Sequence, residues 1–149
     1  MIYAINILST LVLGLYAGSL LTEAMILVPY WRRMKPAEFF GLHNTLGPRL
    51  YRYFAPLTTG AVVLTIAAAV LNRGENLAWN VTAALCISAL IIFFIYFNKA
   101  NKSFADHSLK DDELAEELTR WANWHWFRTV LIIIALTISI AGHLLTHAV

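Results

Sequence analysis

Four long apolar stretches constrain the fold more than any other feature of this sequence. They cover approximately residues 2–28, 50–71, 77–97 and 127–145. Each is close to the roughly 20 residues that a helix needs to cross the hydrocarbon layer of a membrane. Backbone groups in lipid must be hydrogen-bonded within their own segment, which favours helices over open strands. The sequence therefore predicts an all-α, integral membrane four-helix bundle.

The composition supports this class and leaves little chain for anything else. Hydrophobic residues make up 59% of the chain and charged residues 13%, whereas soluble domains are nearer half apolar and a quarter charged. We expect a single membrane domain over residues 1–149. The only cysteine, Cys86, lies inside the third stretch and has no partner for a disulfide or a thiolate metal site. We interpret it as a core-filling side chain.

The distribution of basic residues predicts the orientation. Arg73 lies in the short loop between the second and third stretches, and the other ten of the eleven Lys and Arg residues lie on the opposite side. Cytoplasmic loops carry such an excess. We expect a protein of the plasma (inner) membrane with both termini outside and its polar loops in the cytoplasm. The N-terminal apolar run, which no basic residue precedes, is expected to stay as a membrane helix. The charge balance indicates no nucleic-acid partner.

Prolines and glycines predict two breaks near the cytoplasmic side. Pro29 is expected to end the first helix, because its ring blocks the preceding turn. Residues 36–46 are then expected to form a short interfacial helix, which Gly47 and Pro48 separate from the second span. An acidic segment that begins at Asp111 is expected to start a helix that continues into the fourth span, as a cytoplasmic extension of it.

The first span carries a small-residue pair and a carboxylate. Gly14 and Gly18 form a small-xxx-small pattern, which predicts close approach of a neighbouring helix. Glu23 lies deep enough that its charge is costly unless it is paired or hydrated. It either extends to the interface or faces the bundle, where it would meet an arginine or a histidine. We favour the second, because intramembrane carboxylates usually face inward.

The segment from Trp121 to Arg128 is the densest group of polar and aromatic side chains. At helical spacing Trp121, either Trp124 or His125, and Arg128 fall on one face. Interfacial tryptophan belts and snorkelling arginines explain part of this composition. They explain less well the presence of Asn123 and His125 among these residues, so we expect the stripe to face the bundle interior.

Further polar residues are expected at the same end of the bundle. Polar groups that converge from all four spans at one depth indicate a pocket. For His43 two interpretations stay open: a hydrated ring at the interface, or a position over the mouth of the bundle. The expected set is Glu23, His43, Asn44, Asn98, Asn101, Asn123, His125 and Arg128.

The chain resembles the anthrone-oxygenase-like family in three features taken together. These are the four spans, a polar residue near the proline of the first span, and the pattern Asn98…Trp121-x-x-Trp124-x-x-x-Arg128. Members of the family are small four-helix membrane proteins long catalogued as a domain of unknown function, and the resemblance covers nearly the whole chain. Characterised members are associated with the oxygenation of anthrones to anthraquinones without an added cofactor. The resemblance implies an oxygenase or oxidase that acts on an apolar aromatic substrate, anthrone- or hydroquinone-like, with O₂. A family likeness transfers fold better than activity.

That chemistry suggests roles for the polar residues. A base removes a C–H proton from a flat phenolic substrate, and the resulting carbanion passes an electron to O₂. His125 or His43 is the expected base, because imidazole titrates near neutral pH. Arg128 would stabilise the enolate oxygen, the indoles would stack on the rings, and Glu23 would orient the histidine. The predicted catalytic residues are His125, His43, Arg128 and Glu23, and the predicted substrate-binding residues are Trp121, Trp124, Asn98, Asn123 and Asn44.

Two other functions stay open. In one, His43, His125 and Glu23 hold iron, copper or haem. In the other, the chain is a non-catalytic membrane accessory or lipid-binding subunit. A homo-oligomer is compatible with all three functions. The sequence contains no serine-hydrolase motif and no phosphate-binding glycine loop.

Overall fold

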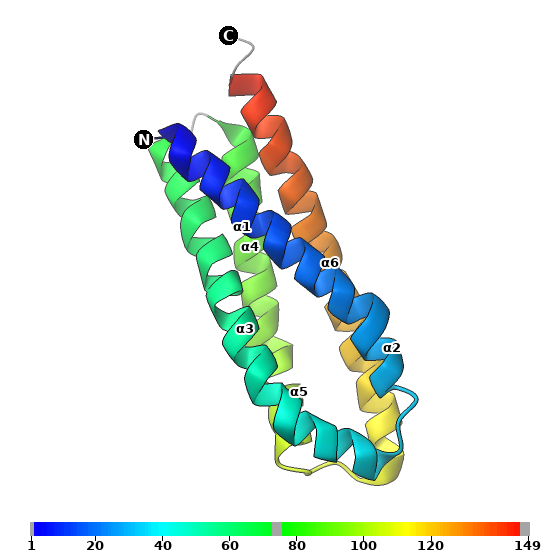
Figure 1. Ribbon diagram of the computed structural model, residues 1–149. Coiled ribbons are helices and arrows are strands. Elements are labelled where there is room, and N and C mark those ends of the chain that lie inside the picture. The colour runs from blue at the N-terminus through cyan, green and yellow to red at the C-terminus, as the bar shows by residue number, and fades with distance from the viewer. Residues whose placement is uncertain (1, 73–75, 147–149) are drawn as a thin grey trace.

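The computed structural model describes residues 2–72 and 76–146, and over these residues it consists of helices without strands. Four long helical rods run up and down the molecule (Figure 1). All four are long and apolar enough to cross a membrane, and they cover Ile2–Trp31, Pro36–Leu71, Leu77–Ala105 and Asp111–His143. The predicted fold class, an all-α membrane four-helix bundle, is confirmed.

Two of the four rods contain a π-helical turn. The elements in chain order are α1 (Ile2–Thr22), the π-helix η1 (Glu23–Leu27), α2 (Val28–Trp31), α3 (Pro36–Leu71), α4 (Leu77–Ile92), the π-helix η2 (Phe93–Phe97), α5 (Asn98–Ala105) and α6 (Asp111–Thr146). Helix α1 packs against α3 and α6, and α4 packs against the same two helices. The four rods therefore form a closed ring around a common interior.

The break predicted at Pro29 is wrong. The first rod continues through Pro29 to Trp31, because the proline occupies the first turn of α2. Because the rod does not end there, the missing N–H leaves one carbonyl of the preceding turn without its helical partner. The π-helical turn η1 directly precedes it, so the register of the rod changes there while the rod itself does not end.

The separate interfacial helix is also not observed. Residues 36–46 are the first turns of α3, which continues through Pro48 and Pro56 to Leu71. Each internal proline frees the backbone carbonyl four residues earlier. Those carbonyls belong to Asn44 and Arg52, which are both exposed. They can be solvated without disrupting the core, so the helix tolerates both prolines.

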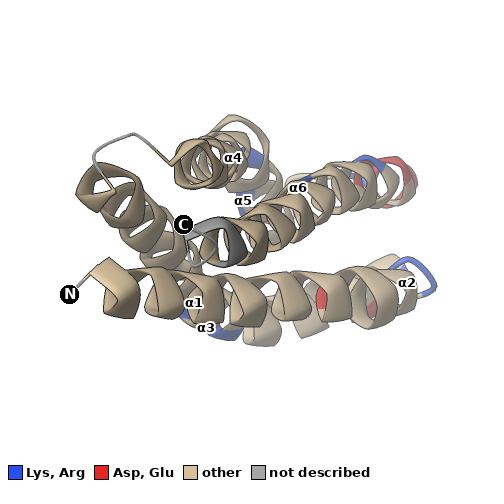
Figure 2. Ribbon diagram, turned by 90° about the horizontal axis from the view of Figure 1, so that it is seen from above, with Lys and Arg blue, Asp and Glu red and all other residues tan. Residues whose placement is uncertain are grey.

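Charged positions lie mainly toward the end of the bundle that holds α2 and the start of α6 (Figure 2). There, the backbone N–H of Lys110 donates to Oε2 of Glu113 at 3.0 Å, which caps α6. Helix α6 then runs without a break from its acidic start into the apolar span, as the sequence predicts.

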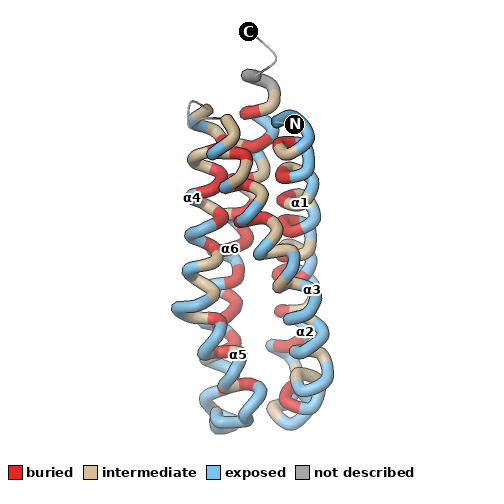
Figure 3. Tube along the Cα trace, turned by 90° about the vertical axis from the view of Figure 1, so that its left-hand side faces the viewer, coloured by how far each residue is buried: buried red, intermediate tan, exposed pale blue. Residues whose placement is uncertain are grey.

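Buried residues line the inner face of every rod (Figure 3) and form two hydrophobic clusters. One cluster is aromatic, with Trp31, Phe97 and Trp121 among its members. The other is mainly aliphatic, with Leu20 and Ile132 among its members. Along both the first rod and α6 a short interval separates the two clusters. Four buried polar residues occupy that interval, the ionisable Glu23, His125 and Arg128 together with Thr129, whose hydroxyl donates to the backbone carbonyl of His125.

Candidate functional site

Helix α6 contributes a buried stripe of three side chains to the polar interval. Trp121, His125 and Arg128 are 5%, 0% and 8% exposed, whereas the intervening Trp124 is 37% exposed. The helical spacing left either Trp124 or His125 for the inner face, and the structure shows that His125 is the buried one. The prediction that the stripe faces the interior is correct for these three residues.

The two π-helical turns adjoin this stripe. Glu23 is the first residue of η1, and Phe97 is the last residue of η2. A π-helical turn takes up an extra residue and so changes the direction of the side chains that follow, and such turns are frequent at functional sites. Both Glu23 and Phe97 lie against the stripe, from opposite walls of the ring of helices. No pattern in the sequence indicates either turn.

Both ring nitrogens of His125 are engaged. The Nε2–H donates to the backbone carbonyl of Leu20 at 3.0 Å, because a carbonyl can only accept. An N–H of the Arg128 guanidinium donates to Nδ1 at 2.9 Å. This arrangement defines a neutral imidazole with its proton on Nε2. The lone pair that could remove a substrate proton is therefore occupied by Arg128.

Glu23 and Arg128 form a loose buried ion pair. Oε2 of Glu23 lies 4.0 Å from a guanidinium nitrogen of Arg128 and 3.7 Å from Nδ1 of His125. Among the described residues, the Glu23 carboxylate makes no closer polar contact. The guanidinium carbon lies 4.2 Å from the centre of the Phe97 ring, a cation–π contact, and the buried Nε has no hydrogen-bond partner. Unused hydrogen-bonding capacity thus remains on both charged groups.

Trp121 holds the histidine in place. Its ring stacks on His125 with centroids 4.9 Å apart and an angle of 10° between the planes. Trp31 and Phe97 approach it edge-on, and its Nε1–H donates to Oδ1 of Asn101 at 3.0 Å. Because the ring is buried by these contacts, it supports the imidazole and offers no free face for a substrate.

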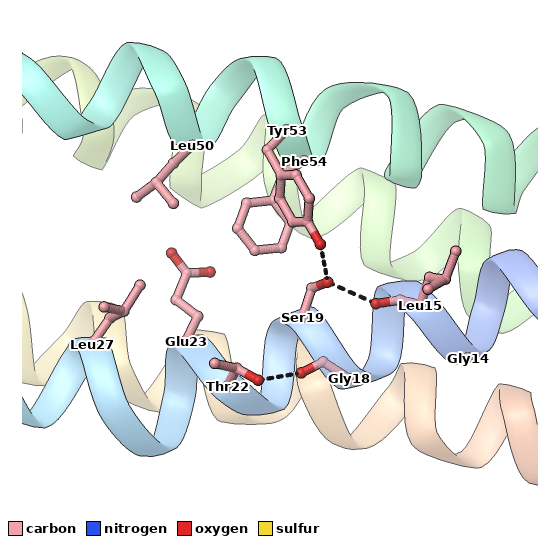
Figure 4. Close-up of a pocket in the computed structure, with 10 residues that line it drawn as sticks. All are labelled: Gly14, Leu15, Gly18, Ser19, Thr22, Glu23, Leu27, Leu50, Tyr53 and Phe54. Carbon is pink, nitrogen blue, oxygen red and sulfur yellow. Dashed lines mark hydrogen bonds between the residues drawn. The ribbon is translucent and has the colours of Figure 1, made fainter.

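A cleft of about 440 Å³ opens beside this cluster, between the first rod and α3. Figure 4 shows the Glu23 side chain directed into it, toward Leu50 of α3. The volume lies within the range of about 300–1,000 Å³ that is usual for small-molecule sites. Glu23 is thus the one member of the buried cluster that lines the cleft. The residues that line the cleft are Gly14, Leu15, Gly18, Ser19, Thr22, Glu23, Leu27, Leu50, Tyr53 and Phe54.

The structure places His43 away from this cluster, in an aromatic environment. Its ring packs against Phe39 and Phe104, with centroids 5.6 and 5.5 Å apart, and its Nδ1 is buried without a partner. Asn44, on the next position of α3, instead contacts Nε2 of His107 at 2.9 Å. Neither residue lines the cleft.

The other predicted binding residues face outward. Asn98 and Asn123 are exposed. Trp124 stacks on Tyr96 with centroids 5.6 Å apart, at the outer surface. The predicted convergence of polar groups from all four spans is therefore limited to Glu23, His125 and Arg128, with Asn101 behind Trp121.

Sequence reasoning missed a second polar contact, which crosses the cleft. The Ser19 hydroxyl donates to the carbonyl of Leu15 at 2.7 Å, so the Tyr53 hydroxyl, 2.7 Å away, donates to Ser19 (Figure 4). A serine on an apolar span and a tyrosine near its end are too common to be noticed singly. The available signal was the spacing of Ser19 and Glu23, four residues apart and so on one helix face.

The three residues considered for a metal do not come together. Within residues 2–72 and 76–146, no group of three or more His, Cys, Asp and Glu side chains is arranged to hold a metal ion. His43 lies in the aromatic cluster, while His125 uses both ring nitrogens in hydrogen bonds.

Fold and site together define a class: a four-helix membrane protein with a buried carboxylate–histidine–arginine cluster beside an open apolar cleft. The family model for anthrone oxygenase matches residues 48–138, more than half of the chain. The chain belongs to the anthrone oxygenase family, as the resemblance in its sequence suggested. No curated protein and no solved structure matches it. The matched range includes His125 and Arg128 but not the first rod, so the position of Glu23 is known from the structure alone.

Proposed function

We propose that the protein is a membrane oxygenase that converts an anthrone-like substrate to a quinone with O₂, in the cleft between the first rod and α3. One observation carries the proposal: the buried Glu23 carboxylate makes no hydrogen bond within the described chain and lines an apolar cleft. A buried base beside a mainly apolar cleft suits the removal of a weakly acidic C–H proton.

In the proposed reaction, Glu23 takes one proton from the methylene carbon opposite the substrate carbonyl. The C–H electron pair delocalises onto the carbonyl oxygen, and the anion passes one electron to O₂. The resulting radical and superoxide combine to form a C–O bond, and the peroxide takes the proton back from Glu23. Glu23 then removes the second methylene proton while the O–O bond breaks, and the departing hydroxide takes that proton as water. One anthrone and one O₂ thus give one anthraquinone and one water.

This assignment changes the roles that the sequence suggested. Glu23 becomes the base, because it reaches the cleft and because Arg128 occupies the free lone pair of His125. Arg128 and His125 become positioning residues that fix the carboxylate from behind. The guanidinium also keeps a positive charge near the anion formed in the cleft, which lowers the cost of forming it in a medium of low dielectric constant.

The experiment uses purified protein in lipid nanodiscs with an anthrone and ¹⁸O₂. We expect anthraquinone to form faster than in nanodiscs without protein, with one labelled oxygen in the new carbonyl and the other in water. O₂ uptake should equal the anthrone consumed. If the rate equals the spontaneous oxidation, the enzymatic proposal fails.

The same measurements separate the two other functions. The accessory or lipid-binding function fits an apolar cleft equally well, and it would give bound lipid in the purified protein without turnover. The metal or haem function would give stoichiometric iron or copper and a visible absorption band. No feature of the described site favours it over the carboxylate mechanism.

We further propose that the end with α2, α5 and the start of α6 faces the cytoplasm, with both termini outside. The ten-to-one bias in basic residues supports it. The exposed Ser108 and Leu77 lie near opposite ends of the bundle, and Cys86 is buried. In a Cys86→Ala background, Leu77→Cys should react with a membrane-impermeant maleimide on intact cells, and Ser108→Cys only after permeabilisation. The reverse pattern would overturn this orientation.

A further inference from the structure

Gly14 and Gly18 form an open part of the cleft, where a close helix contact was predicted. A Cβ placed on either glycine would meet no atom within 4 Å, whereas one on Gly142 would lie 3.0 Å from Cβ of Ala78. Gly142 therefore marks a tight contact between α4 and α6. The prediction that Gly14 and Gly18 bring a neighbouring helix close is wrong within the described structure, because they line empty space.

The cleft extends along α1 away from Glu23. Gly18 precedes Glu23 by five residues and Gly14 precedes it by nine. At 1.5 Å per residue these positions are about 7.5 Å and about 13.5 Å from Glu23 along the helix axis. Leu15 and Ser19 lie between them on the α1 side, and Tyr53 and Phe54 close the α3 side. The cleft is thus an elongated trough with the carboxylate toward one end.

We propose that Gly14 and Gly18 set the length of the fused-ring substrate that the cleft accepts, with the substrate lying along α1. This inference rests on the proposed function for the position of the reacting carbon at Glu23. The rings remote from that carbon then lie over the bare backbone of Gly18 and, in a longer molecule, of Gly14. Flat rings fit against a helix surface that lacks side chains, and apolar walls favour their burial.

A second copy of this chain is the other occupant that a small-xxx-small pair suggests. The geometry disfavours it. The two glycines face α3 of the same chain across the cleft, and the Ser19–Tyr53 hydrogen bond of 2.7 Å spans the space between the helices. A fused-ring substrate displaces only this one hydrogen bond, by rotation of the exposed Tyr53 side chain, whereas a helix from another copy would have to separate α1 from α3.

The experiment measures equilibrium binding of two quinones to the protein in nanodiscs: the three-ring 9,10-anthraquinone and its linear four-ring analogue. Binding of a quinone needs no turnover. Gly18→Leu should weaken binding of both by tenfold or more, since the added side chain would occupy the space of a ring. Gly14→Leu should weaken binding of the four-ring quinone by tenfold and that of the three-ring quinone less than twofold.

Gly41→Leu is the matched control, because Gly41 lies outside the cleft on α3 and also has no atom within 4 Å of an added Cβ. It should leave both affinities within twofold of the wild type. If Gly14→Leu weakens both quinones equally, or if neither cleft variant differs from the control, the inference fails. A loss of dimer in the glycine variants without a change in quinone affinity would also overturn it.

These outcomes are distinguishable from failure of the proposed function. A wild-type protein that binds both quinones and shows the graded response, but forms no anthraquinone from anthrone, would disprove the oxygenase and leave the length limit standing as a property of a binding protein. A protein that turns over anthrone with equal affinities in all variants would disprove only the length limit.

Discussion

Replacing Glu23 with glutamine should lower kcat/KM for anthrone oxidation by about 100-fold or more, since a positioned general base contributes roughly 10²–10⁴-fold. Glutamine keeps the shape of the side chain but has no carboxylate to accept the proton. The substitution also leaves Arg128 without its anion and should lower stability, but the 2.9 Å hydrogen bond to His125 and the contact with Phe97 keep the guanidinium in place. The measurement is the rate of O₂ uptake at several anthrone concentrations, corrected for spontaneous oxidation.

Glu38→Gln provides the control for this variant. Glu38 is exposed in the first turn of α3 and lies outside the cleft. The Glu38→Gln variant should retain the wild-type kcat/KM for anthrone oxidation. If Glu23→Gln keeps more than a third of the wild-type activity, the carboxylate is not the base, and the mechanism would have to use a different group in the cleft.

Replacing Arg128 with leucine should destabilise the protein by about 3–5 kcal/mol, because it leaves a buried carboxylate without its cation. The substitution also removes the hydrogen bond to Nδ1 of His125 and the contact with Phe97. The measurement is the unfolding free energy in mixed detergent micelles, followed by circular dichroism. Turnover should be lost as well, because the positioning of Glu23 depends on this arginine.

A double-mutant cycle tests whether the loss of stability comes from the uncompensated charge of Glu23. Glu23→Gln combined with Arg128→Leu should recover at least half of the lost stability, since the uncompensated charge is then absent. Activity should not recover. Arg120→Leu is the control: this arginine forms exposed ion pairs with Glu116 and Glu117, and such pairs contribute about 0–1 kcal/mol. Additive effects in the cycle would show that Glu23 and Arg128 do not interact energetically.

The four membrane spans could be predicted from length and composition, because the hydrocarbon layer sets a minimum run of apolar residues. The inner stripe of α6 could be predicted too, since helical spacing alone places Trp121, His125 and Arg128 on one face. The inward direction of Glu23 followed from the cost of an unpaired charge in lipid. These features depend on local spacing or on one large energy term.

The remaining features depend on distances between helices, which no local pattern records. Gly14 and Gly18 are bare backbone whether a helix packs on them or a cleft opens above them. The continuity of α3 through Pro48 depends on whether the freed carbonyl of Asn44 is solvated. The sequence leaves two positions open for His43, at the interface or over the mouth of the bundle, and only the structure shows that its ring packs against Phe39 and Phe104.

The π-helical turn η1 has a consequence for how this chain can change in length. Removing one residue from within Glu23–Leu27 would return that turn to ordinary α-helical winding and keep the faces of α1 and α2 unchanged on either side. A protein shortened at Glu23 itself could still assemble its two hydrophobic clusters, yet it would have lost its buried carboxylate. The place where the first rod best tolerates a deletion is therefore also the place where a deletion would separate folding from chemistry.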